Sequence, residues 1–412
     1  MKRVAITGIG VVAPTGGDAR SFFAALVEGR SAVRRLEGRF HERLVSRVGA
    51  PVAFDASAHF PAPKLRMLDR VSQFALVAAG QALADAGGVF DHLDRRRAGV
   101  FIGTGMGGAQ TADDGYHTLY AENSDRVKPF SVLMAMNNAP AAWIGLEHAL
   151  EGPNLTYSTA CSSSAVAIGE AARRIAAGEV DAMIAGGAEA PLNFGTLKAW
   201  DALRTLAIED PADPSASCKP FAKDRSGLVL GEGAAMVVLE DLERATRRGA
   251  RIHALIAGYG LTTDAAHITR PTVAGQAGAM RRALEDAGLA PDAIGHINAH
   301  GTATQANDGV ETAAIKEVFG AHARRIAVSS TKSMHGHLLG AAGALELIAA
   351  VLAMERQIVP PTAHLRQPDP ECDLDYVAEG ARAVPGLAAV ASNSFAFGGT
   401  NAVLIACAAQ SR

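Results

Sequence analysis

The sequence predicts an α/β fold built from two related halves, and three observations carry this prediction. Strand-like apolar runs alternate with helix-like runs along all 412 residues. The pattern Ala-Leu-x-Asp-Ala-Gly ends one helix-like run at Gly87 and recurs at Gly288. In each half the same order follows: a strand ending in Gly-x-Gly, the Asp-Ala-Gly helix, a strand with a glycine loop, and a Ser/Thr-rich elbow before an apolar helix. Because no flexible linker separates the halves, we expect one unit of residues 1–250 and 251–412.

The composition is that of an ordinary soluble globular protein, with 49% apolar and 20% charged residues. A net charge of −3 gives no general reason to bind nucleic acid or an anionic membrane. The N-terminus does not resemble a signal peptide, and no apolar run is long enough to span a bilayer. The four cysteines are scattered, which argues against a disulfide framework or a cysteine zinc site and favours the reducing cytoplasm.

Two glycine clusters of the first half superficially match phosphate-binding loops. The opening run of residues 2–13 reads as a strand with a G-x-G-x-x-A pattern, but Pro14 falls where a phosphate-binding helix would continue. Proline in a helix interior costs roughly 3 kcal/mol. The cluster at residues 103–108 follows a second strand, and the turn residues Asp113-Asp-Gly115 then leave no clear helix for a pyrophosphate. We therefore favour tight turns and close backbone packing at both clusters.

The next elements of the first half are an amphipathic helix at residues 71–87 and an elbow at residues 158–165. The elbow places Cys161 just before a helix at residues 165–178, with serines at 162–164 available to satisfy its free amides. A thiol at a helix N-terminus feels the positive end of the macrodipole, which favours the nucleophilic thiolate. Cys161 is thus a candidate for covalent catalysis, and a buried structural cysteine is the alternative for this segment alone.

The second half supplies histidines at the equivalent places. His300 follows an apolar strand and precedes Thr302 and Thr304, and loops that leave strand ends often carry the chemistry of α/β proteins. The elbow at residues 329–343 then contributes Lys332, His335 and His337 before a helix at residues 344–354. A lone histidine is more often structural, but Cys161, His300 and His337 at matching places of a duplicated unit favour catalysis.

These motifs resemble those of the elongating β-ketoacyl-acyl carrier protein synthases, in the KAS I/II group of the thiolase-like superfamily. The similar blocks are Val4-Ala-Ile-Thr-Gly-Ile-Gly, Thr159-Ala-Cys-Ser-Ser, Asn298-Ala-His-Gly-Thr, Thr331-Lys-Ser, Gly336-His-Leu-Leu-Gly-Ala-Ala-Gly and Asn393-Ser-Phe-Ala-Phe-Gly-Gly-Thr-Asn. They run over almost the whole chain and are highly specific together. The resemblance implies five alternating αβαβα layers, a homodimer and acyl carrier protein as partner.

The resemblance also implies a reaction, a decarboxylating Claisen condensation between an acyl group and malonyl-acyl carrier protein. Cys161 would carry the acyl group, and His300 and His337 would stabilise the enolate left by decarboxylation. The amides of Cys161 and Phe397 would form the oxyanion hole. The substrates would arrive on the phosphopantetheine of the carrier protein, with no metal and no other cofactor. Fatty acid and specialised polyketide or polyene elongation both remain open.

Further residues take roles by the same resemblance. Lys332 would act beside the histidines with Glu311 as its carboxylate partner, Thr302 and Thr304 would bind the pantetheine arm, and Phe397 would swing as a gate. Met106 and Trp200 would line the acyl tunnel, and their bulk predicts a short tunnel or one that reorganises.

The docking candidates for the acidic carrier protein are Lys64, Arg66 and Arg70, with Arg126 and Lys128 as a second basic pair. A solvated helix face is the alternative for these cations.

Two positions depart from the family pattern. His335 stands where a smaller residue is usual and Ala396 where glycine is frequent, so the first is expected to perturb the surroundings of His337 and the second to stiffen the gate.

The main alternative function is that of the partner subunit of a heterodimeric ketosynthase/chain-length-factor pair, which typically lacks the nucleophile. A thiolase would use a second catalytic cysteine, an initiating synthase would pair histidine with asparagine, and a cysteine hydrolase would not explain His337.

Overall fold

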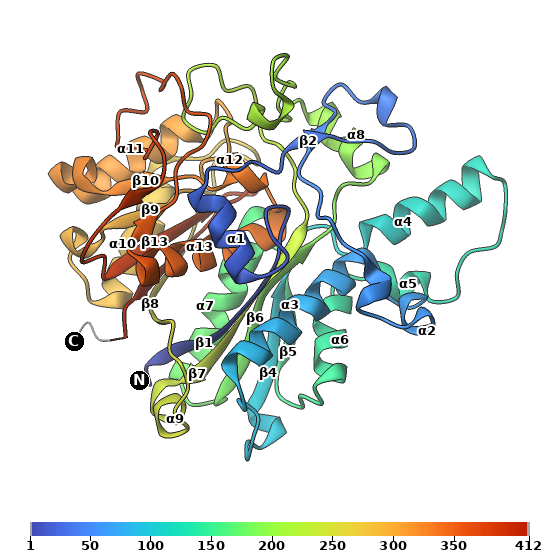
Figure 1. Cartoon of the computed structure of the whole chain (residues 1–412), viewed down its shortest axis with the longest axis horizontal. Helices are drawn as coiled ribbons and strands as arrows, with labels where there is room; N and C mark the ends of the chain where they lie inside the picture. The colour runs from blue at the N-terminus through green and yellow to red at the C-terminus, as the bar shows by residue number, and fades with distance from the viewer. Residues whose placement is uncertain (1, 410–412) are drawn as a thin grey trace.

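A computed structural model describes residues 2–409 and confirms the α/β fold, with one ten-stranded sheet and helices on its faces (Figure 1). The strands of this sheet are β1 (Val4–Val12), β4 (Ala98–Gly103), β5 (Asn154–Tyr157), β6 (Ala182–Glu189), β7 (Gly233–Asp241), β8 (Ala254–Thr263), β9 (His296–Asn298), β10 (Ala327–Ser329), β13 (Ala389–Phe395) and β14 (Thr400–Cys407). Two small sheets pair β2 (Arg34–Arg35) with β3 (Val48–Gly49) and β11 (Ile358–Val359) with β12 (Arg382–Ala383).

The α-helices fill the segments between the strands. They are α1 (Ala19–Val27), α2 (Ala62–Leu65), α3 (Arg70–Ala86), α4 (Ala109–Tyr116), α5 (Ser131–Ala135), α6 (Ala139–Glu147), α7 (Ser163–Ala176), α8 (Phe194–Leu203), α9 (Leu242–Arg247), α10 (Val273–Ala287), α11 (Asp308–Phe319), α12 (Lys332–His335) and α13 (Ala342–Arg356). Among residues 2–409, no helix combines the length and the apolar character needed to cross a membrane.

The strand order repeats itself about the centre of the sheet, where β1 and β8 pair antiparallel over Val4–Ile6. On one side β7 and β6 follow as antiparallel neighbours, and then β4 and β5 as parallel ones. On the other side β14 and β13 follow antiparallel, and then β9 and β10 parallel. The two sets of five strands have the same pairing pattern, which is the arrangement that a duplicated unit predicts.

The helices and the two five-stranded halves of this sheet together form five layers. Helix α3 packs on β1, β7 and β6, while α10 packs on β8 and β14. Helices α7 and α13 contact each other and strands of both sets, so they form the middle layer (Figure 1). Helix α13 is buried on every side from Ala342 to Met354, because its apolar residues have sheet or helix neighbours all round. The start of this middle layer positions the candidate site.

The glycines of the Gly-x-Gly strands let the outer helices approach the sheet. A Cβ at Gly8 would lie 2.0 Å from the carbonyl oxygen of Ala82 in α3. At the equivalent position Gly258, a Cβ would lie 2.2 Å from the carbonyl oxygen of Ala283 in α10. Any side chain there would push the helix off the strand, so these glycines serve close packing, the structural role that the sequence analysis favoured.

The repeated aspartates have a matching structural purpose. Asp85, near the end of α3, accepts a hydrogen bond of 2.9 Å from the amide of Ile9 in β1. Asp286, near the end of α10, accepts one of 2.9 Å from the amide of Tyr259 in β8. Each carboxylate therefore fastens a helix to its strand, which explains why the pattern recurs.

The second glycine cluster corrects one expectation, because a helix does follow it. Residues Ala109–Tyr116 form α4 despite the turn-like Asp-Asp-Gly sequence. The carboxylate of Asp113 accepts a hydrogen bond from the amide of Gly195, which gives this acidic pair a tertiary partner. The amides of Gly105 and Met106, which a phosphate would need, donate to Glu189 instead. The cluster thus binds an internal carboxylate.

A buried histidine links the two halves and carries a pH-dependent prediction. The ring of His253 is 4% exposed, and its nitrogens lie 2.7 Å from Asp85 and 2.8 Å from Glu355. Burial lowers its pKa, but the hydrogen bonds to both carboxylates outweigh burial and raise the pKa above the ordinary value. The stabilisation is therefore complete below the unfolded pKa of about 6.5 and is lost as pH rises through the raised folded pKa.

We expect His253→Gln to lower the free energy of unfolding by about 1 to 2 kcal/mol at pH 6 and by clearly less at pH 9. Urea unfolding at both pH values measures this difference. His322→Gln is the matched control, since His322 bonds the carbonyl of Ile294 and no carboxylate. An equal loss for His253→Gln at both pH values would contradict the prediction.

Candidate active site

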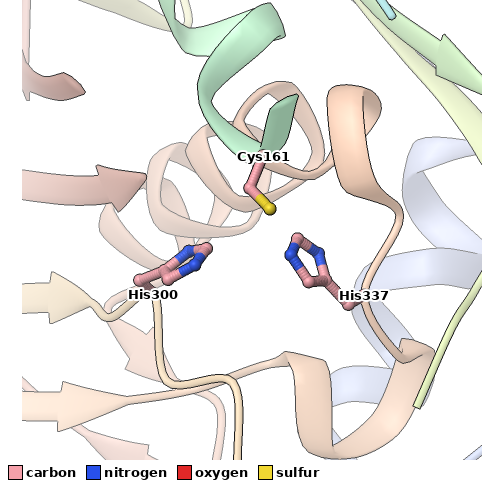
Figure 2. Close-up of side chains that lie close together, drawn as sticks. All are labelled: Cys161, His300 and His337. Carbon is pink, nitrogen blue, oxygen red and sulfur yellow. The ribbon is translucent and has the colours of Figure 1, made fainter. Parts of the chain in front are cut away.

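Three side chains from distant parts of the chain converge at the start of the middle layer. The sulfur of Cys161 and one ring nitrogen each of His300 and His337 lie within 4.8 Å of one another. Figure 2 shows the thiol between the two imidazoles, which approach it from different segments. The rings meet edge to face with centroids 5.4 Å apart, and all three residues are buried. The structure thus brings together the three residues that the motifs singled out.

The elbow that carries Cys161 is a tight turn before α7. Ala160 has a φ of 50°, a left-handed conformation that an alanine adopts only when its surroundings impose it. The hydroxyl of Ser163 supports the turn by donating to the carbonyl of Ala160 and accepting from the amide of Thr159. Ser164 instead accepts from the amide of Ala344 in α13. The serines therefore hold the turn and join the two central helices, and they do not cap α7 as predicted from the sequence.

The protonation state of Cys161 differs from the expected thiolate. Burial raises the pKa of its thiol to about 12, against the opposing effects of the Lys332 charge and a hydrogen bond from the Phe397 amide. Cys161 as a whole is only 6% exposed, so little water is available to solvate a thiolate. The resting form is therefore the thiol, and the proton has to leave as the sulfur attacks.

Lys332 sets the tautomer of His300. Its ammonium group donates to the carbonyl of His300 at 2.6 Å and lies 3.4 Å from Nδ1 of the same residue. An ammonium group has no lone pair, so Nδ1 can only act as acceptor and the ring proton is on Nε2. Burial and the charge of Lys332 both hold the pKa of His300 well below its usual range, so the ring is neutral.

His337 has the same tautomer for a different reason. The amide of Leu339 donates to its Nδ1 at 3.2 Å, which leaves the proton on Nε2. Burial and the charge of Lys332 hold its pKa well below the usual range. Its Nε2 is buried without a hydrogen-bond partner within residues 2–409. A neutral N–H donor therefore points into the site with its hydrogen bond unused.

The carboxylate partner of Lys332 is Glu346, and the expected pairing with Glu311 is wrong. Glu346, in α13, lies 2.5 Å from the ammonium nitrogen, and both side chains are buried. Glu311 accepts instead from the amides of His300 and Gly301, both at 2.8 Å, and from the side chain of Asn393. It shapes the backbone turn after His300 rather than balancing the lysine charge.

Glu189 is a second buried carboxylate that sequence reasoning missed. It ends β6 and accepts hydrogen bonds from the amides of Gly105, Met106 and Gly340 at 2.7, 2.9 and 2.8 Å. These bonds tie the loop after β4 to the elbow that carries His337. Its only sequence signal is a lone charge at the end of a buried strand.

The two residues that depart from the family pattern, His335 and Ala396, fit their surroundings without adding a charge to the site. His335 is buried, with Nδ1 2.8 Å from the carbonyl of Gly336 and Nε2 2.9 Å from the hydroxyl of Thr331. Burial lowers its pKa to about 3, so it adds no charge beside His337. Ala396 packs in the apolar cluster around Cys161, and Gly398 and Gly399, which follow Phe397, have positive φ.

A cavity leads from Cys161 toward the surface. Its lining includes both histidines and the predicted pantetheine residues Thr302 and Thr304, whose hydroxyls are 2.9 Å apart. Trp200 and Phe397 also line it, with stacked rings 5.9 Å apart. Met106 does not line this cavity, and its side chain is 39% exposed. The structure therefore places Trp200 at the site and Met106 outside it.

The docking candidates have different surroundings. Lys64 forms an ion pair with Glu147 at 2.5 Å, and Arg70 forms one with the buried Glu232 at 2.6 Å. Arg66 is exposed, as are Arg126 and Lys128. The internal pairing of Arg70 argues against it as a docking residue, whereas the exposed cations keep their charge available.

The three central side chains also form a donor set that soft metal ions accept. A zinc ion would need the thiolate of Cys161. One thiol beside two neutral imidazoles equally suits nucleophilic chemistry, which needs no metal.

Comparison with known proteins gives consistent matches. Residues 1–245 match the family described as "Beta-ketoacyl synthase, N-terminal domain" and residues 253–366 match "Beta-ketoacyl synthase, C-terminal domain". The chain is 44% identical over 403 residues to "Nodulation protein E" of Rhizobium meliloti, with 98% of each covered. It is 42% identical over 410 residues to "3-oxoacyl-(acyl-carrier-protein) synthase 2" of Coxiella burnetii, again with 98% of each covered.

Solved structures with the same fold also match the chain over their whole length. A β-ketoacyl synthase from Burkholderia phymatum is 40% identical with a TM-score of 0.91, and the match covers 100% of both chains. A structure titled "The ishigamide ketosynthase/chain length factor" is 36% identical with a TM-score of 0.91, and the match covers 99% of both chains. These likenesses extend over both halves and the site between them.

Proposed function

Since this chain belongs to the β-ketoacyl synthase family and condenses an acyl group with malonyl-acyl carrier protein, we propose that Cys161, His300 and His337 perform the reaction. Its substrates arrive on the phosphopantetheine of acyl carrier protein, and the chain is an acyltransferase of fatty acid or polyketide elongation. The observation that carries the proposal is the pair of neutral imidazoles beside one thiol.

In the first half-reaction the thiol of Cys161 attacks the incoming acyl thioester, and the thiol of the carrier's arm leaves with a proton. The Phe397 amide hydrogen-bonds the Cys161 sulfur in the resting site. This amide and that of Cys161 are the donors proposed for the oxyanion of the tetrahedral intermediate. The product is an acyl-enzyme, so the kinetics are ping-pong.

In the second half-reaction the malonyl thioester loses carbon dioxide and leaves an enolate. The Nε2–H groups of His300 and His337 are the donors that stabilise its oxygen, and Lys332 keeps His300 in the required tautomer. The carbanion then attacks the acyl carbonyl on Cys161, which forms the carbon–carbon bond and breaks the carbon–sulfur bond. The sulfur leaves as a thiolate and takes a proton from water to restore the thiol. No redox step is involved.

Several finer features belong to the same proposal. The protein acts as a cytoplasmic homodimer, with Thr302 and Thr304 binding the pantetheine arm and Phe397 gating the thiol against Trp200. The exposed Arg66, Arg126 and Lys128 are the docking residues for the acidic carrier protein. A partner subunit of a ketosynthase/chain-length-factor pair is the alternative, and the presence of Cys161 with both histidines argues against it.

Intact-protein mass after incubation with acyl-carrier-protein thioesters of several chain lengths tests the proposal. We expect a gain of one acyl group that malonyl-carrier protein then removes, with release of carbon dioxide. The chain lengths that react rank the primers. A wild-type protein that forms no adduct with any primer would favour the partner-subunit alternative.

A further inference from the structure

The cavity that leads to Cys161 carries one fixed positive charge, at its exposed end. Arg270 is the only lysine or arginine among the residues of 2–409 that line this cavity. Its side chain is exposed and forms no ion pair or hydrogen bond with the described part of the chain. The histidines at the inner end are neutral and the buried Lys332 is paired with Glu346, so Arg270 is the cation of the lining that is available to a ligand.

The acidic residue of the lining forms no ion pair with Arg270 within residues 2–409. Asp264 is the acidic residue in the lining, and its Oδ1 accepts from the hydroxyl of Thr272 at 2.8 Å and from the side chain of Asn401 at 2.9 Å. Its other oxygen accepts from the amide of Thr272 at 3.3 Å. Asp264 is thus committed to holding the loop, and Arg270 is left to bind an external anion.

The loop that carries Arg270 is attached to the segment that follows Phe397. The amide of Gly398 donates to the carbonyl of Ile268 at 2.8 Å, and the amide of Asp264 donates to that of Gly399 at 2.9 Å. Pro271 follows Arg270 directly, which restricts the backbone of the arginine to extended conformations. The cation is therefore held at the rim beside the proposed gate.

The geometry points to Arg270 as the residue that binds the phosphate of the phosphopantetheine arm at the mouth of the cavity. This inference rests on the proposed function. The arm has its sulfur at one end and its phosphate at the other, so a thioester at Cys161 directs the phosphate outward. Thr302 and Thr304 line the same cavity, and their hydroxyls are 2.9 Å apart. Arg270 then distinguishes donors that carry the phosphate from those that lack it.

The test compares acyl transfer to Cys161 from three donors with the same acyl chain: acyl-pantetheine, acyl-phosphopantetheine and acyl-carrier protein. Intact-protein mass against time gives kcat/KM for each donor. For Arg270→Ala we expect about a fivefold fall with both phosphate-bearing donors, the size of an exposed ion pair, and no change with acyl-pantetheine. Arg270→Lys is expected to lie between, because it keeps the charge and loses the planar fork.

Arg3→Ala is the matched control, since Arg3 is exposed and lies outside this cavity. An equal fall with acyl-pantetheine would show a general effect on the loop and would overturn the inference. A fall with the carrier protein alone would assign Arg270 to an acidic side chain of that protein and would also overturn it. Wild-type protein that accepts none of the three donors would refute the proposed function itself.

Discussion

A Cys161→Ala variant is expected to lose condensation by on the order of a thousandfold or more, while it still releases carbon dioxide from malonyl-carrier protein. No other cysteine of residues 2–409 lines the cavity, so the acyl group loses its thiol attachment and the carbon–carbon bond cannot form by the same route. The Nε2–H groups of His300 and His337 owe their tautomers to Lys332 and the Leu339 amide, not to the sulfur. Decarboxylation therefore keeps its donors.

The measurement pairs product analysis with carbon dioxide release from labelled malonyl-carrier protein. Cys218→Ala is the matched control, because Cys218 is equally buried but packs in a separate apolar cluster with Val229 and Ala303. It should leave both half-reactions intact. If Cys161→Ala abolished carbon dioxide release as well, the two histidines would not act independently of the thiol, and the division of labour proposed here would be wrong.

The sequence was sufficient to predict the duplicated fold and to select Cys161, His300 and His337 as candidate site residues. Both predictions rest on local patterns: glycines and aspartates that fasten a helix to a strand, and reactive side chains at the ends of elements. Such patterns can be recognised in the sequence because each contact joins a strand to a helix of the same half. Asp85 with Ile9 and Asp286 with Tyr259 are contacts of this kind.

The buried carboxylates could not be assigned from the sequence in the same way. Lys332 pairs with Glu346, which is fourteen positions later by residue number, and the choice between Glu346 and Glu311 depends on how α13 packs against the loop after His300. The sequence does indicate that Glu346 is unusual, since it is the sole charged residue inside the buried run from Ala342 to Met354. A charge there has to meet an opposite charge, but the sequence does not name its partner.

The state of the thiol is another property that depends on tertiary structure. A helix start favours the thiolate, but desolvation opposes it, and the sequence alone does not say how deeply Cys161 is buried. In the structure burial prevails and raises the pKa to about 12. A low-pKa thiolate would be exposed to oxidation and alkylation, whereas a buried thiol reacts once a substrate supplies the acyl group.

Lys332→Met is expected to have the largest effect on stability, because it leaves the buried Glu346 without its cation. Burial already raises the pKa of Glu346 to about 7, so the full cost of the unpaired carboxylate is reached above that pH. Breaking a buried ion pair on one side costs about 3 to 5 kcal/mol. The same change frees Nδ1 of His300 from its ammonium partner, so the required tautomer is no longer enforced. Condensation should fall on the order of a hundredfold or more, as for loss of a positioned acid or base. Urea unfolding and single-turnover condensation measure the two effects.

A double variant separates the two effects. Adding Glu346→Gln to Lys332→Met removes the stranded charge, so much of the lost unfolding free energy should return, since a neutral amide is cheaper to bury than a carboxylate. Condensation should stay low, because the double variant still lacks the group that holds His300 in its Nε2–H form. If activity returned together with stability, Lys332 would serve the fold alone, and the tautomer of His300 would be set by the geometry of its loop.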